Sequence, residues 1–309
     1  MLSRERKNAF IENRFNTLFP YLNEYGDEAT IKKGIEEDFD SLLELTDMKI
    51  CQKRCDYFKL KGVKPEDFKE RVIDLGNGKE FLAGIRFRAL VVEKPFVAVW
   101  LNFPELNSEL LKELSVAVKE EFKMFNPLWI AFQLQLSSKL DNCELGDYTI
   151  LGSIKSLVKD IDSSDVTLEL AHDLDFYEKY SSEYDLFHKE NPILAKEVKK
   201  ESLEDLQESV DSSLLFKVKV SGEFAGIIAG RVEDYNGIKG ICILEKLIFS
   251  KFRSQGYGRI SQQMFINLLA ERDLGILWGT IFHQNHGSLK TAMNTGRKIV
   301  EVESFFKLD

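Results

Sequence analysis

The stretch that most constrains the fold is Arg253–Gly258, which reads RSQGYG. It follows an apolar run, Ile243–Phe252, that predicts a strand, and it opens a helical pattern that continues to about Arg272. Glycine lets the backbone approach a ligand closely, and the first turn of a helix offers unpaired amides and the positive end of the helix dipole. A strand, a glycine turn and a helix in this order therefore predict a site for a phosphate or pyrophosphate.

This loop differs from two common phosphate-binding motifs, because it is too short for a Walker loop and lacks the third glycine of the dinucleotide fingerprint. Its R-x-x-G-x-G pattern instead resembles the pyrophosphate loop of the GNAT acyltransferase superfamily, which binds acyl-coenzyme A. An N-x-x-S motif at Asn285–Ser288 and a glycine at Gly296 keep the register of that family. The C-terminal half, about 166–309, is thus similar to a GNAT domain.

The resemblance implies an α/β (α+β) fold with a mixed, mostly antiparallel sheet flanked by helices. A chain of 309 residues predicts about two domains, and we place the boundary near 150–165, within the polar region 137–165. The predicted domains are 1–155 and 156–309. Residues 1–75 read as mostly helical, with Pro20 interrupting the first helix.

The first half is interpreted as a degenerate second copy of the same fold. Phe96–Leu136 runs strand, helix, strand in the same order as Ile241–Phe282. Between its first strand and its helix, however, the sequence PELN contains no glycine. We therefore expect one acyl-coenzyme A site per chain, in the second domain.

The resemblance also implies which residues bind acetyl-coenzyme A. Backbone amides of Ser254–Arg259 would hold the pyrophosphate, the backbone of Leu247–Phe249 would bond the pantetheine and polarise the thioester carbonyl, and Asn285 would bond the pantetheine arm. The full predicted set is Leu247, Ile248, Phe249, Arg253, Ser254, Gln255, Gly256, Tyr257, Gly258, Arg259, Asn285 and Ser288.

The activity that the resemblance implies is N-acetyl transfer to a small-molecule or peptide amine by direct attack on the thioester. An ammonium must first lose a proton, and Glu245 is the candidate general base. It lies in an otherwise apolar strand, where burial would raise its pKa. The alternative is a solvated glutamate paired with Lys246 or with a neighbouring lysine.

One position departs from the family pattern. Many members have a tyrosine as general acid four residues after the small residue of the asparagine motif, where this chain has Ala292. His283 or His286 would substitute for it, or both are surface residues; two histidines alone do not make a zinc site, so no metal is predicted. The alternative function is a non-catalytic GNAT-fold module that binds a partner or senses acyl-coenzyme A.

Composition narrows the partners and the compartment. The net charge is −9, so nucleic acid is a poor default partner and a tRNA-dependent transferase is disfavoured. No apolar stretch approaches the roughly 18 residues of a membrane span, and no signal region follows the N-terminus. Four cysteines do not make a disulfide framework, and Cys51 and Cys55 read as free thiols rather than a metal or redox pair. We expect a cytoplasmic protein without a membrane partner.

Overall fold

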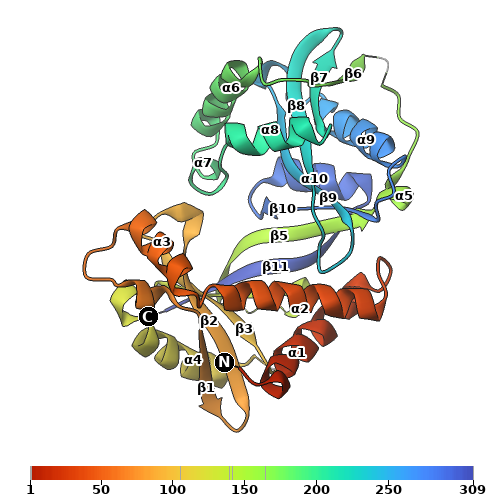
Figure 1. The fold of residues 1–309 in the computed structure, drawn as a ribbon. Coiled ribbons are helices and arrows are strands. Elements are labelled where there is room, and N and C mark those ends of the chain that lie inside the picture. The colour runs from red at the N-terminus through yellow and green to blue at the C-terminus, as the bar shows by residue number, and fades with distance from the viewer. Residues whose placement is uncertain (1, 105, 139, 141, 164, 309) are drawn as a thin grey trace. The chain divides into compact units, whose positions relative to one another are not determined.

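The computed structural model describes residues 2–104, 106–138, 140, 142–163 and 165–308. The chain forms two compact units, residues 1–146 with 301–309 and residues 147–300 (Figure 1). The sequence placed the boundary at 155 and assigned the last strand to the second domain. The boundary differs because the region read as a polar linker contains strand β5 (Cys143–Ser153). The assignment of the last strand differs because the last residues of strand β11 (Lys298–Lys307) pair with β4 (Trp129–Leu134) of the first unit.

The first unit is a mixed sheet with helices. Its strands run in the order β1-β2-β3-β4-β11, and every pair is antiparallel except β3 with β4. The helices are α1 (Arg4–Leu22), α2 (Glu28–Glu44), α3 (Met48–Phe58) and α4 (Ser108–Glu121), and the remaining strands are β1 (Arg71–Gly76), β2 (Lys79–Phe87) and β3 (Pro95–Leu101).

The second unit has the same kind of sheet, in the order β5-β10-β9-β8-β7-β6. Only β9 and β10 are parallel. Its other strands are β6 (Val166–Leu170), β7 (Leu215–Val220), β8 (Glu223–Val232), β9 (Gly240–Ile248) and β10 (Ile276–Phe282). Its helices are α5 (Ile154–Leu157), α6 (Tyr177–Glu190), α7 (Leu194–Glu197), α8 (Leu203–Asp211), α9 (Tyr257–Leu269) and α10 (His286–Thr295).

Each unit contains one parallel strand pair, and in both units a helix connects the two strands. Parallel neighbours require such a crossover, which α4 supplies between β3 and β4 and α9 supplies between β9 and β10. Each pair shares only three residue positions before its described pairing stops, at Ala98 with Ala131 and at Cys242 with Trp278. All four strands continue beyond those positions, so each pair opens toward its C-terminal end.

Two N-terminal expectations need correction. Helix α1 continues through Pro20 to Leu22, because a proline in the last turn removes few helical hydrogen bonds. Arg71–Gly76, expected to be helical, is strand β1, which a turn at Asn77 and Gly78 joins to β2. Both turn residues have positive φ, 54° and 74°, as the tight turns of hairpins require.

The cores of the two units are separate. One surrounds buried aromatic residues such as Phe68, Phe81 and Phe122, and the other includes Tyr180, Phe249 and Phe265. The four cysteines are free thiols. Among the described residues, no helix is both long and apolar enough to cross a bilayer.

Candidate active site

The predicted anion loop has the geometry of an open helix N-terminus. Helix α9 begins at Tyr257, directly after Gly256, whose φ of 87° is accessible to glycine at little cost. No side chain caps this helix, so its first-turn amides point outward with the positive end of the helix dipole. A Cβ built on Gly256 meets no atom within 4 Å, which shows that the space in front of the loop is open.

Arg253 holds the loop to the rest of the second unit. Its Nε donates to the carbonyl of Ile248 at 2.8 Å, and its Nη1 lies 2.5 Å from a carboxylate oxygen of Glu190 in α6. Its Nη2 is buried and has no hydrogen-bond partner among the described residues. The other predicted loop residues lie at this turn: Ser254, with a φ of 61°, Gln255, which is exposed, and Tyr257, Gly258 and Arg259 in the first turn of α9.

The predicted backbone contacts at Leu247, Ile248 and Phe249 differ in whether their amides face the opening between β9 and β10. The amide of Phe249 donates to Ala225 of β8 at 2.8 Å, so it is not available to a ligand. Because backbone groups alternate direction along a strand, the amide of Ile248 points to the opposite side, toward the gap. Leu247 and Phe249 contribute buried side chains to the core. The amide of Phe249 is thus paired within the sheet, whereas that of Ile248 faces the gap.

Glu245 is buried on the same stretch of β9, with 8% of its surface exposed. Its Oε2 accepts a 2.5 Å hydrogen bond from the hydroxyl of Tyr180 in α6, and its Oε1 accepts from the amide of Lys246 at 2.8 Å. Burial, together with the negative charge of Glu201, raises the pKa of Glu245 to about 7, although both hydrogen bonds favour the ionised form. The solvated glutamate paired with the Lys246 ammonium is therefore not what the structure shows.

Tyr180 was not identified from the sequence. Burial and the charge of Glu245 raise the pKa of its hydroxyl far above the ordinary value, so it stays protonated and donates. Its oxygen in turn accepts from the amide of Glu201 at 3.2 Å. The pKa of Glu201 is raised to about 7, mainly by burial and then by Asp205. In the sequence, Tyr180 belongs to an aromatic stripe with Tyr177 and Tyr184 that reads as core, and nothing local marks it as the partner of Glu245.

Two cations share one neutral acceptor beside α9. Lys246 Nζ and Arg297 Nη2 donate to Oε1 of Gln262, at 3.1 and 3.2 Å. Burial and the neighbouring Arg297 lower the pKa of Lys246 to about 7, and burial lowers the pKa of Arg297 to about 10. Glu245 and Lys246, adjacent in β9, thus both titrate near neutrality.

The asparagine motif forms the start of α10. Asn285 caps this helix, because its Oδ1 accepts from the amide of Ser288 at 3.2 Å. Gly296 ends the helix with a φ of 104°. Ala292, the position at which the resemblance predicts a tyrosine, is fully buried and carries no hydroxyl. His283 is half-buried and His286 is exposed. Among the described residues, no group of three or more His, Cys, Asp or Glu side chains is placed to hold a metal.

Comparison with solved structures identifies the fold. A GCN5-related N-acetyltransferase from Sphaerobacter thermophilus matches with a TM-score of 0.50 and 10% identity, over 85% of this chain and 89% of that chain. A GNAT-family acetyltransferase from Colwellia psychrerythraea matches at 0.47 and 11%, over 84% and 95%. Arabidopsis thaliana Naa50, in complex with the bisubstrate analogue CoA-Ac-MVNAL, matches at 0.35 and 12%, over 46% and 97%.

No family model and no curated protein sequence matches the chain. The chain has the GNAT fold, a mixed, mostly antiparallel sheet flanked by helices, which confirms the fold predicted from the sequence.

Proposed function

We propose that residues 147–300 form an N-acetyltransferase that transfers an acetyl group from acetyl-coenzyme A to a primary amine. One observation carries the proposal: the uncapped N-terminus of α9 lies next to the opening of β9 from β10, and the buried carboxylate of Glu245 lies on the same stretch of β9. The open space at Gly256 fits an anionic group there.

The residues of the loop would bind and orient the co-substrate. Amides from Ser254 to Gly258 and the guanidinium of Arg253 would hold the pyrophosphate. The amide of Ile248 would donate to the thioester oxygen, where negative charge develops as the amine attacks. The amine nitrogen bonds to the carbonyl carbon, the carbon–sulfur bond breaks and the sulfur leaves with the electron pair. The nitrogen then gives up a second proton, which passes through water to the thiolate or to bulk solvent, and the neutral amide is left.

Glu245 would remove the proton that keeps the amine from attacking. A base with a pKa of about 7 is well matched to this task at neutral pH. The proton passes to the carboxylate through water, and Tyr180 positions the carboxylate through its hydrogen bond. A thiolate is a moderately weak base, so it leaves without a dedicated acid at Ala292.

Ala292 also supports a second candidate, a module that binds acyl-coenzyme A without transferring the acyl group. The two functions differ in whether release of coenzyme A depends on an amine. The test is a thiol-release assay with acetyl-coenzyme A and a panel of primary amines that includes polyamines, aminoglycosides and peptide N-termini.

Amine-dependent release that Glu245→Gln lowers at least about 100-fold supports the transferase, since general-base catalysis typically contributes 10²–10⁴-fold. Glu169→Gln is the matched control, because Glu169 is an exposed strand glutamate paired with Lys219. Binding of acetyl-coenzyme A without amine-dependent release would favour the module, and wild-type turnover in Glu245→Gln would reject Glu245 as the base.

A further inference from the structure

The guanidinium of Arg253 has one nitrogen that is neither bonded to backbone nor buried. Its Nε donates to the carbonyl of Ile248 at 2.8 Å, and its Nη2 is buried away from solvent. The remaining nitrogen, Nη1, lies 2.5 Å from a carboxylate oxygen of Glu190, the last residue of α6. The ring of Phe187, also in α6, covers one face of the guanidinium, with 5.3 Å to its centroid. An incoming anion therefore meets Glu190 at the one nitrogen of Arg253 that it can reach.

Glu190 is not placed to stabilise its own helix. The C-terminus of a helix is the negative end of its dipole, so a carboxylate there is unfavourable. Glu190 occupies that end of α6, and among the described residues its carboxylate has one ion-pair partner, Arg253. What this side chain contributes is thus its contact with the loop that precedes α9.

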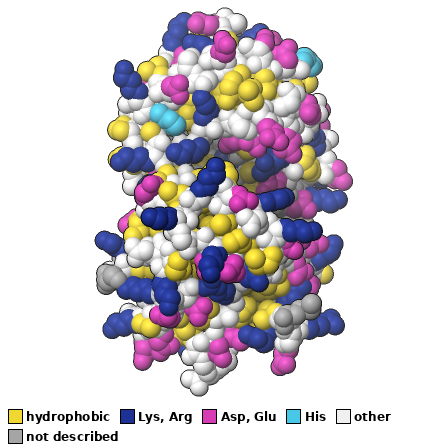
Figure 2. Space-filling view, turned by 60° about the vertical axis from the view of Figure 1, so that its left-hand side comes forward, with side chains coloured by type: hydrophobic (Ala, Val, Ile, Leu, Met, Phe, Trp, Pro, Cys, Tyr) yellow, Lys and Arg dark blue, Asp and Glu magenta, His cyan; other side chains and the backbone are white. Residues whose placement is uncertain are grey.

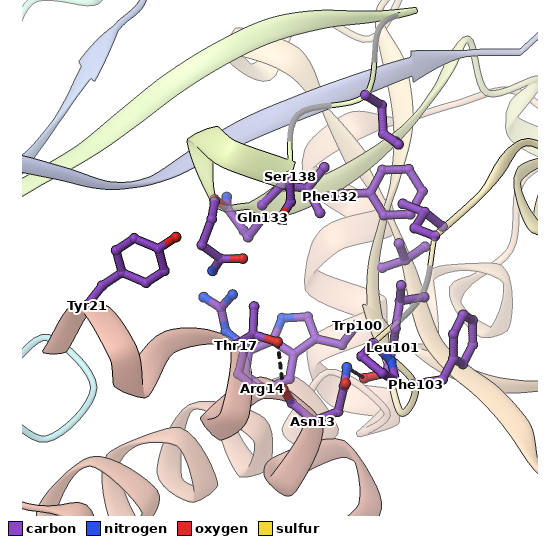
Figure 3. A pocket seen from close by; sticks show the side chains of 16 residues that line it. Asn13, Arg14, Thr17, Tyr21, Trp100, Leu101, Phe103, Phe132, Gln133 and Ser138 are labelled. Carbon is purple, nitrogen blue, oxygen red and sulfur yellow. Dashed lines mark hydrogen bonds between the residues drawn. The ribbon is translucent and has the colours of Figure 1, made fainter. Parts of the chain in front are cut away.

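A second pair of arginine and glutamate, in the first unit, shows what a fixed ion pair looks like in this chain. Arg14 lines a cavity of about 640 Å³ beyond the positions where β3 and β4 pair (Figure 3). Both of its terminal nitrogens bond the two oxygens of Glu301, at 2.5 and 2.6 Å, and the side chain of Glu301 is only 3% exposed. Arg253 and Glu190 instead share one hydrogen bond, and the side chain of Glu190 is 47% exposed, so this pair is exchangeable.

The anion proposed at the start of α9 competes with Glu190. Arg253 opens the turn that leads to Gly256 and the uncapped helix, so a pyrophosphate there lies beside its guanidinium. A phosphate oxygen and the Glu190 carboxylate would then bind the same nitrogen. Two anions held on one guanidinium lie close enough to repel each other, because the Coulomb energy grows as their separation falls.

We propose that Glu190 sets the affinity of the chain for coenzyme A: it holds Arg253 in the free protein, yields it to the pyrophosphate on binding and takes it back as the product leaves. The carboxylate thus weakens binding of both acetyl-coenzyme A and coenzyme A, and it favours release of the product. The proposal rests on the proposed function, because it requires the pyrophosphate at the start of α9.

Another ion pair near the loop separates this exchange from a general effect of charge. Lys251 bonds both carboxylate oxygens of Glu223, at 2.7 and 2.5 Å, and both side chains are exposed. Glu223→Gln removes the same charge as Glu190→Gln but releases a lysine that lies outside the R-x-x-G-x-G motif. Basic and acidic side chains are interspersed on the face that Figure 2 shows, so one lost charge does not create a patch of a single sign there. Glu223→Gln is therefore the matched control.

The experiment is a calorimetric titration of the full chain with acetyl-coenzyme A and, separately, with coenzyme A. Glu190→Gln should tighten binding of both about fivefold, the strength of an exposed ion pair. Glu223→Gln should change both by less than about twofold, because exposed charges away from the contact are screened by salt. Combining Glu190→Gln with Arg253→Ala should remove most of the gain, since no guanidinium is left to release, and this non-additivity identifies the contact.

Unchanged or weaker binding by Glu190→Gln, with the wild type binding, would overturn the proposal and leave the site itself standing. An equal gain in Glu223→Gln, or a gain that persists without Arg253, would trace the effect to overall charge and would also contradict it. No binding by any of these proteins, the wild type included, would refute the proposed site and this proposal with it. If Glu190→Gln is not recovered folded, Glu190→Ala makes the same comparison, and failure of both to fold would mean that the pair is structural, which overturns the exchange.

Discussion

The hydrogen bond between Tyr180 and Glu245 gives a quantitative prediction about the candidate base. Tyr180→Phe removes the hydroxyl that donates to Glu245 at 2.5 Å and leaves the buried ring in place. This bond stabilises the ionised carboxylate, so its loss must raise the pKa of Glu245. A hydrogen bond to a charged group contributes about 1.5–3 kcal/mol, and one pKa unit corresponds to about 1.4 kcal/mol. The pKa of Glu245 should therefore move from about 7 to roughly 8–9.

The assay is a pH titration of the carboxyl carbons in protein labelled with ¹³Cδ-glutamate. Glu245→Gln assigns the resonance, and the measurement needs no acceptor substrate. Tyr184→Phe is the matched control, because Tyr184 is buried one turn further along α6 and donates to the carbonyl of Lys199 at 2.8 Å. An unchanged or lowered pKa in Tyr180→Phe, or an equal rise in Tyr184→Phe, would refute the assigned hydrogen bond.

Three further predictions concern stability and binding. The pKa of Glu245 in the folded chain, about 7, lies above its ordinary value of 4.5, so the folded chain binds the proton more tightly than the unfolded chain. The free energy of unfolding should therefore fall by about 3 kcal/mol as pH rises from 4.5 to 7. Glu245→Gln should flatten that fall when it is followed by urea denaturation between pH 5 and pH 8. Gly256→Asp should abolish binding of acetyl-coenzyme A in calorimetry, whereas Gly62→Asp, with a similar φ of 81° and equally open surroundings, should not. Glu301→Ala should destabilise the fold by about 3–5 kcal/mol in urea denaturation because it leaves the partly buried Arg14 without this carboxylate. Arg14→Met combined with Glu301→Leu should recover most of the loss.

The outcomes that would contradict these predictions are equally specific. A pH profile unchanged by Glu245→Gln would mean that Glu245 does not titrate near neutrality. Equal loss of binding in Gly256→Asp and Gly62→Asp would point to general destabilisation instead of a ligand clash. A double variant at Arg14 and Glu301 no more stable than Glu301→Ala would show that the ion pair is not the source of the loss.

Features that depend on neighbouring residues could be predicted from the sequence. The strand, glycine turn and helix around RSQGYG are all local, and they correspond to β9, the turn at Gly256 and α9. The capping asparagine and the glycine that ends α10 are also local signals, so their register could be recognised.

Features that depend on distant residues could not be predicted. Tyr180 and Glu245 are separated by 65 positions, and only the packing of α6 brings the hydroxyl to the carboxylate. The last residues of β11 pair with β4 more than 160 positions earlier, so sequence order assigned them to the wrong unit.

The central claim is that one site for acetyl-coenzyme A lies at the start of α9. The most direct measurement is a calorimetric titration of the full chain with acetyl-coenzyme A, repeated with Arg253→Ala and with Arg272→Ala as a matched control, because Arg272 lies past the end of α9 and bonds the carbonyl of Ser213. We expect one site per chain, weakened at least about tenfold by Arg253→Ala and unaffected by Arg272→Ala. No heat and no thermal shift at millimolar ligand, or binding to two sites, would contradict the account.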